Sequence, residues 1–172
     1  VYKGAYSNGN WSFTKLLDRG KEYLQINSGG DLTNLYVAWD DIPAVTDVDG
    51  DGDVDILVFE PGGSTITYFD NRSAESGWGS DSLRYSIEDI CWGKILENQF
   101  NESVYLSDDP DMCSDGFTGG GEILPRHAGS TILALDMDQD GDKDALVGDI
   151  SSRRLVYLHN CLLYTSPSPR DS

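Results

Sequence analysis

The chain has 172 residues, with 30 acidic side chains against 12 basic ones and a formal net charge of −18. Such an acidic composition argues against nucleic acid as a partner, because a nucleic-acid-binding domain needs a basic face. No apolar run is long enough to cross a bilayer, so we expect no membrane insertion.

Short β-branched or alternating runs bounded by turn residues predict an all-β chain without a strong amphipathic helix. In chain order, the expected strands lie near 1–6, 11–17, 34–39, 42–46, 54–60, 65–70, 82–89, 131–135, 145–149 and 154–159. A Ser-Asn-Gly-Asn turn joins the first two strands. Gly62-Gly63 and Ser151-Ser152 supply two further hairpin turns.

Aspartate dominates the loop between the expected strands at 42–46 and 54–60. The segment DVDGDGDVDILV, residues 47–58, places acids on alternate positions: Asp47, Asp49, Asp51, Asp53 and Asp55. Two carboxylates about 4 Å apart repel by roughly 4 kcal/mol at an effective dielectric of about 20. A folded loop that gathers several carboxylates therefore needs a cation, whereas an acidic turn without metal would spread them apart. The flanking strands favour the folded loop.

The same motif returns 89 residues later in the segment DMDQDGDKDALV, residues 136–147. Its acids are Asp136, Asp138, Asp140, Asp142 and Asp144. The offset continues without a gap, because Gly52 matches Gly141 and Tyr68 matches Tyr157. This internal repeat of about thirty residues predicts two equivalent structural units. Their loops should emerge on one face, and the units should pack together through Leu57, Val58, Leu146 and Val147.

Oxygen-only ligands select hard cations, and this many carboxylates in a flexible loop favour calcium over magnesium. We expect two calcium (Ca²⁺) sites. In the first, Asp47, Asp49, Asp51 and Asp55 would ligate through side chains and Asp53 through its carbonyl. In the second, Asp136, Asp138, Asp140 and Asp144 would ligate through side chains and Asp142 through its carbonyl. EF-hand and dockerin loops are excluded, because their twelfth-position acid is replaced by Val58 and Val147.

The pattern D-x-D-x-D-G-x-x-D followed by an aliphatic strand resembles the calcium loop of FG-GAP or VCBS repeats. Such repeats build β-propeller blades, as in integrin α-subunit heads and many bacterial secreted proteins. The stretches CWGK (91–94) and RHAGSTILALDMDQDGDKDALVGDIS (126–151) also resemble FG-GAP-like proteins of Gram-negative bacteria, many of which leave the cell by the type IX pathway. The resemblance covers most of residues 1–160.

This resemblance implies an all-β, partial β-propeller of about two to three blades, each a four-stranded antiparallel sheet, with a long irregular insertion at about 90–130. The remaining blades would lie in the same full-length chain, which we expect to be secreted or at the cell surface. The last segment, CLLYTSPSPRDS (161–172), resembles a sequencing-adapter read-through and is expected to be a non-native tail. A genuine Ser/Pro-rich linker is the alternative.

The insertion contains Cys91 and Cys113, and an even pair in a secreted calcium protein suggests a disulfide. Two free thiols, or pairing outside this segment, are the alternatives. The acidic stretch at 108–111 is interpreted as a solvated turn rather than a third cation site. His127 is interpreted as a hydrogen-bonded residue at a strand entry rather than a ligand.

The leading functional hypothesis is a non-catalytic, extracellular calcium-binding propeller segment for adhesion or recognition of a protein or glycan ligand. No nucleophile–base pair, phosphate loop or catalytic zinc motif is present in the sequence, so we do not expect an enzyme. Two alternatives stay open: an accessory propeller of a secreted polysaccharide-degrading enzyme, and a purely architectural surface-protein module.

Overall fold

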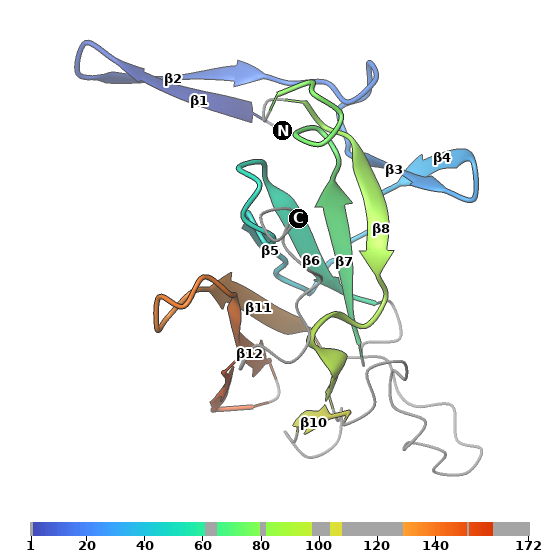
Figure 1. Ribbon diagram of the computed structural model, residues 1–172, viewed down its shortest axis with the longest axis vertical. Helices are drawn as coiled ribbons and strands as arrows, with labels where there is room; N and C mark the ends of the chain where they lie inside the picture. The colour runs from blue at the N-terminus through green and yellow to red at the C-terminus, as the bar shows by residue number, and fades with distance from the viewer. Residues whose placement is uncertain are drawn as a thin grey trace.

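The computed structural model describes residues 2–60, 65–79, 82–97, 104–107, 129–150 and 152–159, and these form an almost purely β structure (Figure 1). The strands are β1 (Tyr2–Ser7), β2 (Asn10–Lys15), β3 (Gln25–Ser28), β4 (Asp31–Asn34), β5 (Ala44–Thr46), β6 (Asp55–Phe59), β7 (Ile66–Asn71), β8 (Tyr85–Asp89), β9 (Ile95–Glu97), β10 (Val104–Leu106), β11 (Ser130–Leu135), β12 (Asp144–Asp149) and β13 (Leu155–Leu158). A short 3-10 turn, η1 (Trp92–Lys94), precedes β9. The predicted all-β class is confirmed.

A four-stranded antiparallel meander, β5-β6-β7-β8, forms the predicted blade. Leu57, in the middle of β6, lies opposite Ala44 on β5 and Tyr68 on β7. The hairpin β3–β4 extends this blade into a six-stranded sheet, because β3 runs parallel to the outer strand β8.

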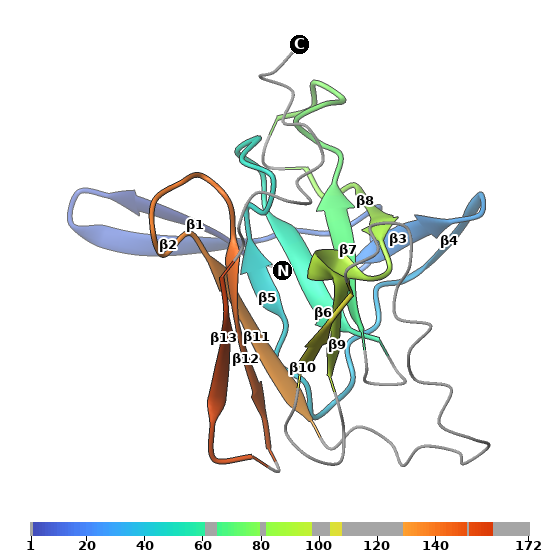
Figure 2. The ribbon, with the colours of Figure 1, turned by 60° about the horizontal axis from the view of Figure 1, so that its bottom comes forward.

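The second repeat forms a three-stranded antiparallel sheet, β11-β12-β13. It meets the first blade through a parallel bridge between Ile42 and Thr131. There the amide of Ile42 donates to the carbonyl of Ser130 at 2.9 Å, and the amide of Ile132 donates to the carbonyl of Ile42 at 3.2 Å. Since β5 and β11 run in the same direction, the loops that follow them emerge at the same end of the two sheets (Figure 2).

Strand β6 is buried on both faces, because successive side chains point to opposite sides of a sheet. One face belongs to a cluster formed with the second sheet: Ala44, Leu57, Phe59, Ile66, Tyr68, Ile95, Ile132, Ala134, Ala145 and Val147. The other face belongs to a cluster formed by Ile26, Ile56, Val58, Phe69 and Tyr85.

The prediction that four aliphatic residues pack the two repeats together is half right. Leu57 and Val147 are buried in the cluster between the sheets. Val58 follows Leu57 and so points to the opposite face, where it joins the other cluster. Leu146 precedes Val147 on β12, so its side chain points to the opposite face of the sheet, where it is only partly buried.

The expected strand at 34–39 is wrong. The chain instead forms the hairpin β3–β4, whose turn contains Gly29 and Gly30 at φ values of 62° and 98°. Leu35 and Val37 produce the alternation that suggested a strand, but they pack against the second cluster as partly buried side chains beyond the end of β4.

The first hairpin, β1–β2, has the two strands and the Asn8-Gly9 turn that the sequence predicts. Every residue of its two strands is exposed, and the hairpin extends away from the larger sheet (Figure 1). Trp11 stacks near Phe13, with ring centroids 6.3 Å apart.

The insertion begins as ordered structure rather than as an irregular loop. Strands β9 and β10 pair, Ile95 joins the cluster between the sheets, and the hydroxyl of Ser130 donates to the buried Glu97 at 2.7 Å. Cys91 is buried, whereas Cys113 lies outside the described residues, so their pairing stays a prediction.

Several other predictions fall on segments outside the described residues: the Gly62-Gly63 turn, Ser151, the acidic stretch at 108–111, His127 and the tail at 161–172. Where the chain is described, it contains no helix with the length and apolar character that crossing a membrane requires.

Candidate metal centre

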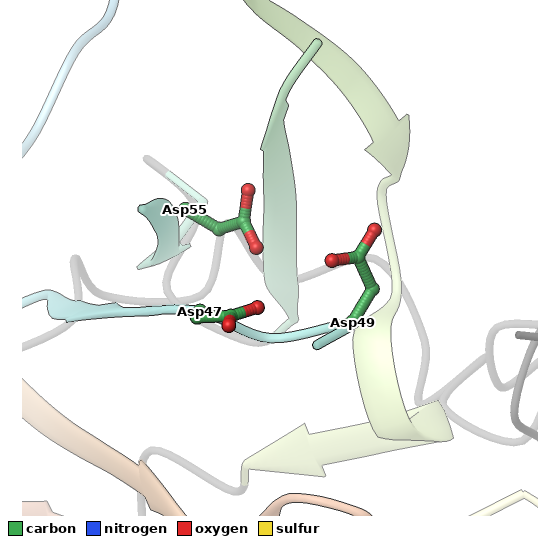
Figure 3. Close-up of side chains that lie close together, drawn as sticks. All are labelled: Asp47, Asp49 and Asp55. Atoms are coloured by element: carbon green, nitrogen blue, oxygen red, sulfur yellow. The ribbon is translucent and has the colours of Figure 1, made fainter. Parts of the chain in front are cut away.

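The first aspartate loop connects β5 to β6 and brings three of its acids together. One carboxylate oxygen each from Asp47, Asp49 and Asp55 lies within 4.8 Å of the other two. Figure 3 shows these three side chains converging from the loop and from the start of β6. Gly50 and Gly52 permit the sharp turn, with φ values of 82° and 97° that side chains other than glycine rarely adopt.

The aspartates also stabilise the conformation of the loop, because their carboxylates accept hydrogen bonds from backbone amides later in the loop. Asp47 accepts from the amide of Gly50 at 2.7 Å through Oδ1 and from that of Gly52 at 3.2 Å through Oδ2. The amide of Asp51 donates to Asp49 at 3.2 Å. These bonds hold the backbone of the loop in a tight turn.

Asp55 is fully buried at the first position of β6. Its Oδ1 accepts from the amide of Asn71 at 2.9 Å, and its Oδ2 accepts from the amide of Val48 at 2.8 Å and the hydroxyl of Tyr68 at 3.3 Å. Burial raises the pKa of Asp55 to about 7, and burial also raises the pKa of Asp49. The ionised form of this cluster is therefore costly until a cation joins it.

The structure places Asp51 and Asp53 in another group of the first repeat, and their predicted roles as a side-chain ligand and a carbonyl ligand stay predictions. One oxygen of each lies within 4.8 Å of the other and of Glu75. Asp53 is fully buried, and its Oδ2 accepts from the amide of Ala74 at 3.0 Å. Its Oδ1, and Oδ2 of Asp51, are buried without a hydrogen-bond partner. Burial raises the pKa of Asp53 to about 6.

The second loop connects β11 to β12 and brings together Asp136, Asp138 and Asp140, again with one oxygen of each within 4.8 Å of the others. Two backbone bonds repeat those of the first loop. The amide of Gly141 donates to Asp136 at 3.1 Å, as Gly52 does to Asp47. The amide of Asp142 donates to Asp140 at 3.0 Å, as the amide of Asp53 does to Asp51 at 2.9 Å. The two loops therefore share several backbone bonds, although Oδ1 of Asp136 accepts from the amide of Asp140 where Asp47 accepts from Gly50.

Asp144 repeats the environment of Asp55 at the start of β12. It is buried, and its Oδ2 accepts from the amide of Met137 at 3.0 Å and from the hydroxyl of Tyr157 at 3.1 Å. Unlike Asp55, it lies outside the three-carboxylate group of its loop. Oδ2 of Asp142, the predicted carbonyl ligand, is buried without a hydrogen-bond partner.

Sequence reasoning missed three residues beside the loops. Asp70, near the end of β7, and Glu75, in the turn after it, lie close to Asp49. His159 follows β13, and its Nε2 lies 2.7 Å from Oδ2 of Asp138. That contact lowers the pKa of Asp138 and raises the pKa of His159. The 89-residue offset was the available signal, because it matches Asp70 with His159.

The donor set of both loops fits a hard divalent cation. Among the described residues, every group of three or more potential metal ligands consists of carboxylates alone. Calcium accepts 6–8 oxygen ligands with flexible geometry, and carboxylates on several loop positions supply such a shell. The buried oxygens that lack hydrogen-bond partners are the kind of group that a bound cation would satisfy.

The sequence profile of the FG-GAP repeat matches residues 41–76. This range contains β5, the first aspartate loop, β6 and β7. No curated protein and no solved structure matches the chain. The matched range coincides with the unit whose four-stranded meander and acidic loop are described above, and residues 41–76 are therefore an FG-GAP repeat.

Proposed function

We propose that the chain is a calcium-binding β-propeller segment of an extracellular protein, that its calcium is structural, and that the propeller serves adhesion or recognition. The observation that carries this proposal is the agreement between the two loops. Both gather three carboxylates at the same end of adjacent sheets, and both are folded by equivalent backbone bonds.

A structural role for the ion follows from what the loops connect. Each loop joins the first two strands of a sheet, and its last acid begins a buried strand of the core. A cation that binds this arrangement only in the folded protein stabilises it by mass action, by about 2.7 kcal/mol at a free concentration one hundred times Kd. Extracellular calcium modules commonly bind at about 10⁻⁴–10⁻³ M, where external calcium is sufficient.

The extracellular setting and the recognition role rest on the repeat itself. FG-GAP repeats occur in extracellular proteins, and stacked sheets provide a rigid support for loops that bind a protein or glycan. Binding of the full chain to a panel of glycans and extracellular matrix proteins, with and without calcium, tests this part. Calcium-dependent binding supports recognition, and a blank panel favours the architectural role.

Calcium titration of the full chain, followed by calorimetry and thermal unfolding, tests the metal assignment. We expect calcium to raise the melting temperature by roughly 10 °C at saturation. Asp47→Asn should abolish binding at the first loop and Asp136→Asn at the second, so each variant is the control for the other. Tighter binding of magnesium than calcium, or no response to either substitution, would contradict the proposal.

A further inference from the structure

We propose that the first repeat holds a second calcium ion, between Asp49, Asp70 and Glu75, next to the ion of its loop. The inference rests on the proposed function, because the loop ion and the second ion would share Asp49. One carboxylate oxygen of each of the three residues lies within 4.8 Å of the other two. They come from separate elements: the loop, strand β7 and the turn after β7.

The buried carboxylate of Asp70 points to a ligand beyond the protein's own groups. Asp70 is 3% exposed, and its Oδ2 pairs with Nε of Arg72 at 2.7 Å. Its Oδ1 is buried and has no hydrogen-bond partner. A buried carboxylate oxygen is normally satisfied by a donor, an ordered water or a metal ion, so the orphaned Oδ1 calls for one of these.

The neighbouring arginine does not neutralise this group of acids. Arg72 contacts Glu75 through Nη1 at 3.4 Å and also pairs with Glu88 through Nη2. One guanidinium is thus shared among Asp70, Glu75 and Glu88, and Asp49 has no part in that ion pairing. The cluster keeps an excess of negative charge, which a divalent cation would offset.

The second repeat offers an internal comparison at the same place. Asp138 is the equivalent of Asp49, and His159 is the equivalent of Asp70. There Nε2 of His159 lies 2.7 Å from Oδ2 of Asp138. In the second repeat, Asp138 therefore contacts a histidine. In the first repeat, the equivalent Asp49 lies close to a second carboxylate, that of Asp70. We infer that the additional ion belongs to the first repeat alone.

Calcium counted by equilibrium dialysis of the full chain tests this inference. The unmodified chain should bind three ions, and Asp70→Asn and Glu75→Gln should each bind two. Asp49→Asn should lose both ions of the first repeat, because its carboxylate faces both groups. Asp70→His, which copies the second repeat, should also bind two ions.

Glu88→Gln is the matched control, because Glu88 contacts Arg72 but lies outside the three-carboxylate group. It should still bind three ions. Glu75 is exposed, so Glu75→Gln keeps the test valid even if Asp70→Asn fails to fold. If the unmodified chain binds two ions and Glu75→Gln also binds two, the inference of a second ion in the first repeat is wrong and the proposed function stands. Absence of any calcium binding would overturn both.

Discussion

The hydroxyl of Tyr68 donates a hydrogen bond to Oδ2 of Asp55 at 3.3 Å. Tyr157 makes the equivalent bond to Asp144 at 3.1 Å. In each repeat the tyrosine lies on the strand that pairs with the strand beginning at the acid, so the sheet register sets the contact. Outer hydrogen bonds of this kind orient a ligand carboxylate and contribute to metal affinity.

Removing one tyrosine hydroxyl should weaken calcium binding at its own loop only. We expect Tyr68→Phe to lower the affinity of the first loop by roughly tenfold, because loss of an outer-shell partner typically costs 10–100-fold. Tyr157→Phe should do the same at the second loop. Calorimetric titration of both variants measures the two affinities. Equal weakening of both loops by either variant would mean that the tyrosine acts through global stability instead.

The calcium-free protein should lose stability as pH rises. Burial raises the pKa of Asp55 and of Asp70 to about 7 and that of Asp53 to about 6, against about 4 in an unfolded chain. At pH values between the unfolded and the folded pKa, the folded state holds more protons than the unfolded state. The stability of the folded state is therefore greatest at low pH and falls as the buried carboxyl groups ionise. We expect the urea midpoint to be lower at pH 8 than at pH 5.

Saturating calcium should reverse this trend, because a bound cation favours the ionised carboxylates and competes with protons. The same urea titrations, repeated at both pH values with calcium, measure the reversal. A calcium-free midpoint that rises between pH 5 and pH 8 would show that burial does not control these groups.

Local patterns were sufficient to predict most of the architecture. Alternate acids located both loops, and short apolar runs located the strands that flank them, because both signals lie within a few residues of the chain. The pattern failed at 34–39, because Leu35 and Val37 pack against the core beyond the end of β4 without forming a further strand.

The neighbours of the loops could not be predicted in the same way. Asp70 and Glu75 reach the first loop only because β7 pairs with β6 in one particular register. The repeat offset matches His159 with Asp70, but it does not show that His159 contacts Asp138 where the first repeat has two acids. Such contacts depend on tertiary packing, which spacing along the chain does not encode.

Equivalent leucines of the two repeats should differ in their contribution to stability. Leu57 is completely buried between the sheets, whereas Leu146 is only partly buried. We expect Leu57→Ala to lower the free energy of unfolding by about 3–4 kcal/mol, because it removes methyl groups and leaves a cavity. Leu146→Ala should cost about 1 kcal/mol. Urea denaturation in saturating calcium measures both values, and equal losses would contradict the packing described for β6 and β12.

The two loops differ at one strained backbone position, where Gly50 in the first matches Gln139 in the second. Both residues have positive φ, 82° for Gly50 and 66° for Gln139. A side chain in this left-handed region costs roughly 1–2 kcal/mol, and glycine avoids that cost at the expense of a more flexible unfolded chain. Apart from its two chain neighbours, no heavy atom lies within 4 Å of the place that a Cβ atom would take at Gly50.

Exchanging these residues should therefore change stability through the backbone alone. We expect Gln139→Gly to raise the free energy of unfolding by about 0.5–1 kcal/mol, and Gly50→Gln to lower it by a similar amount. Calcium affinity should change little in either variant, because the strain is present with and without the ion. Urea denaturation at fixed calcium, together with calorimetric titration, separates the two effects. The backbone explanation would be contradicted if Gly50→Gln raised the free energy of unfolding. It would also be contradicted if either variant changed the calcium affinity strongly and left the free energy of unfolding unchanged.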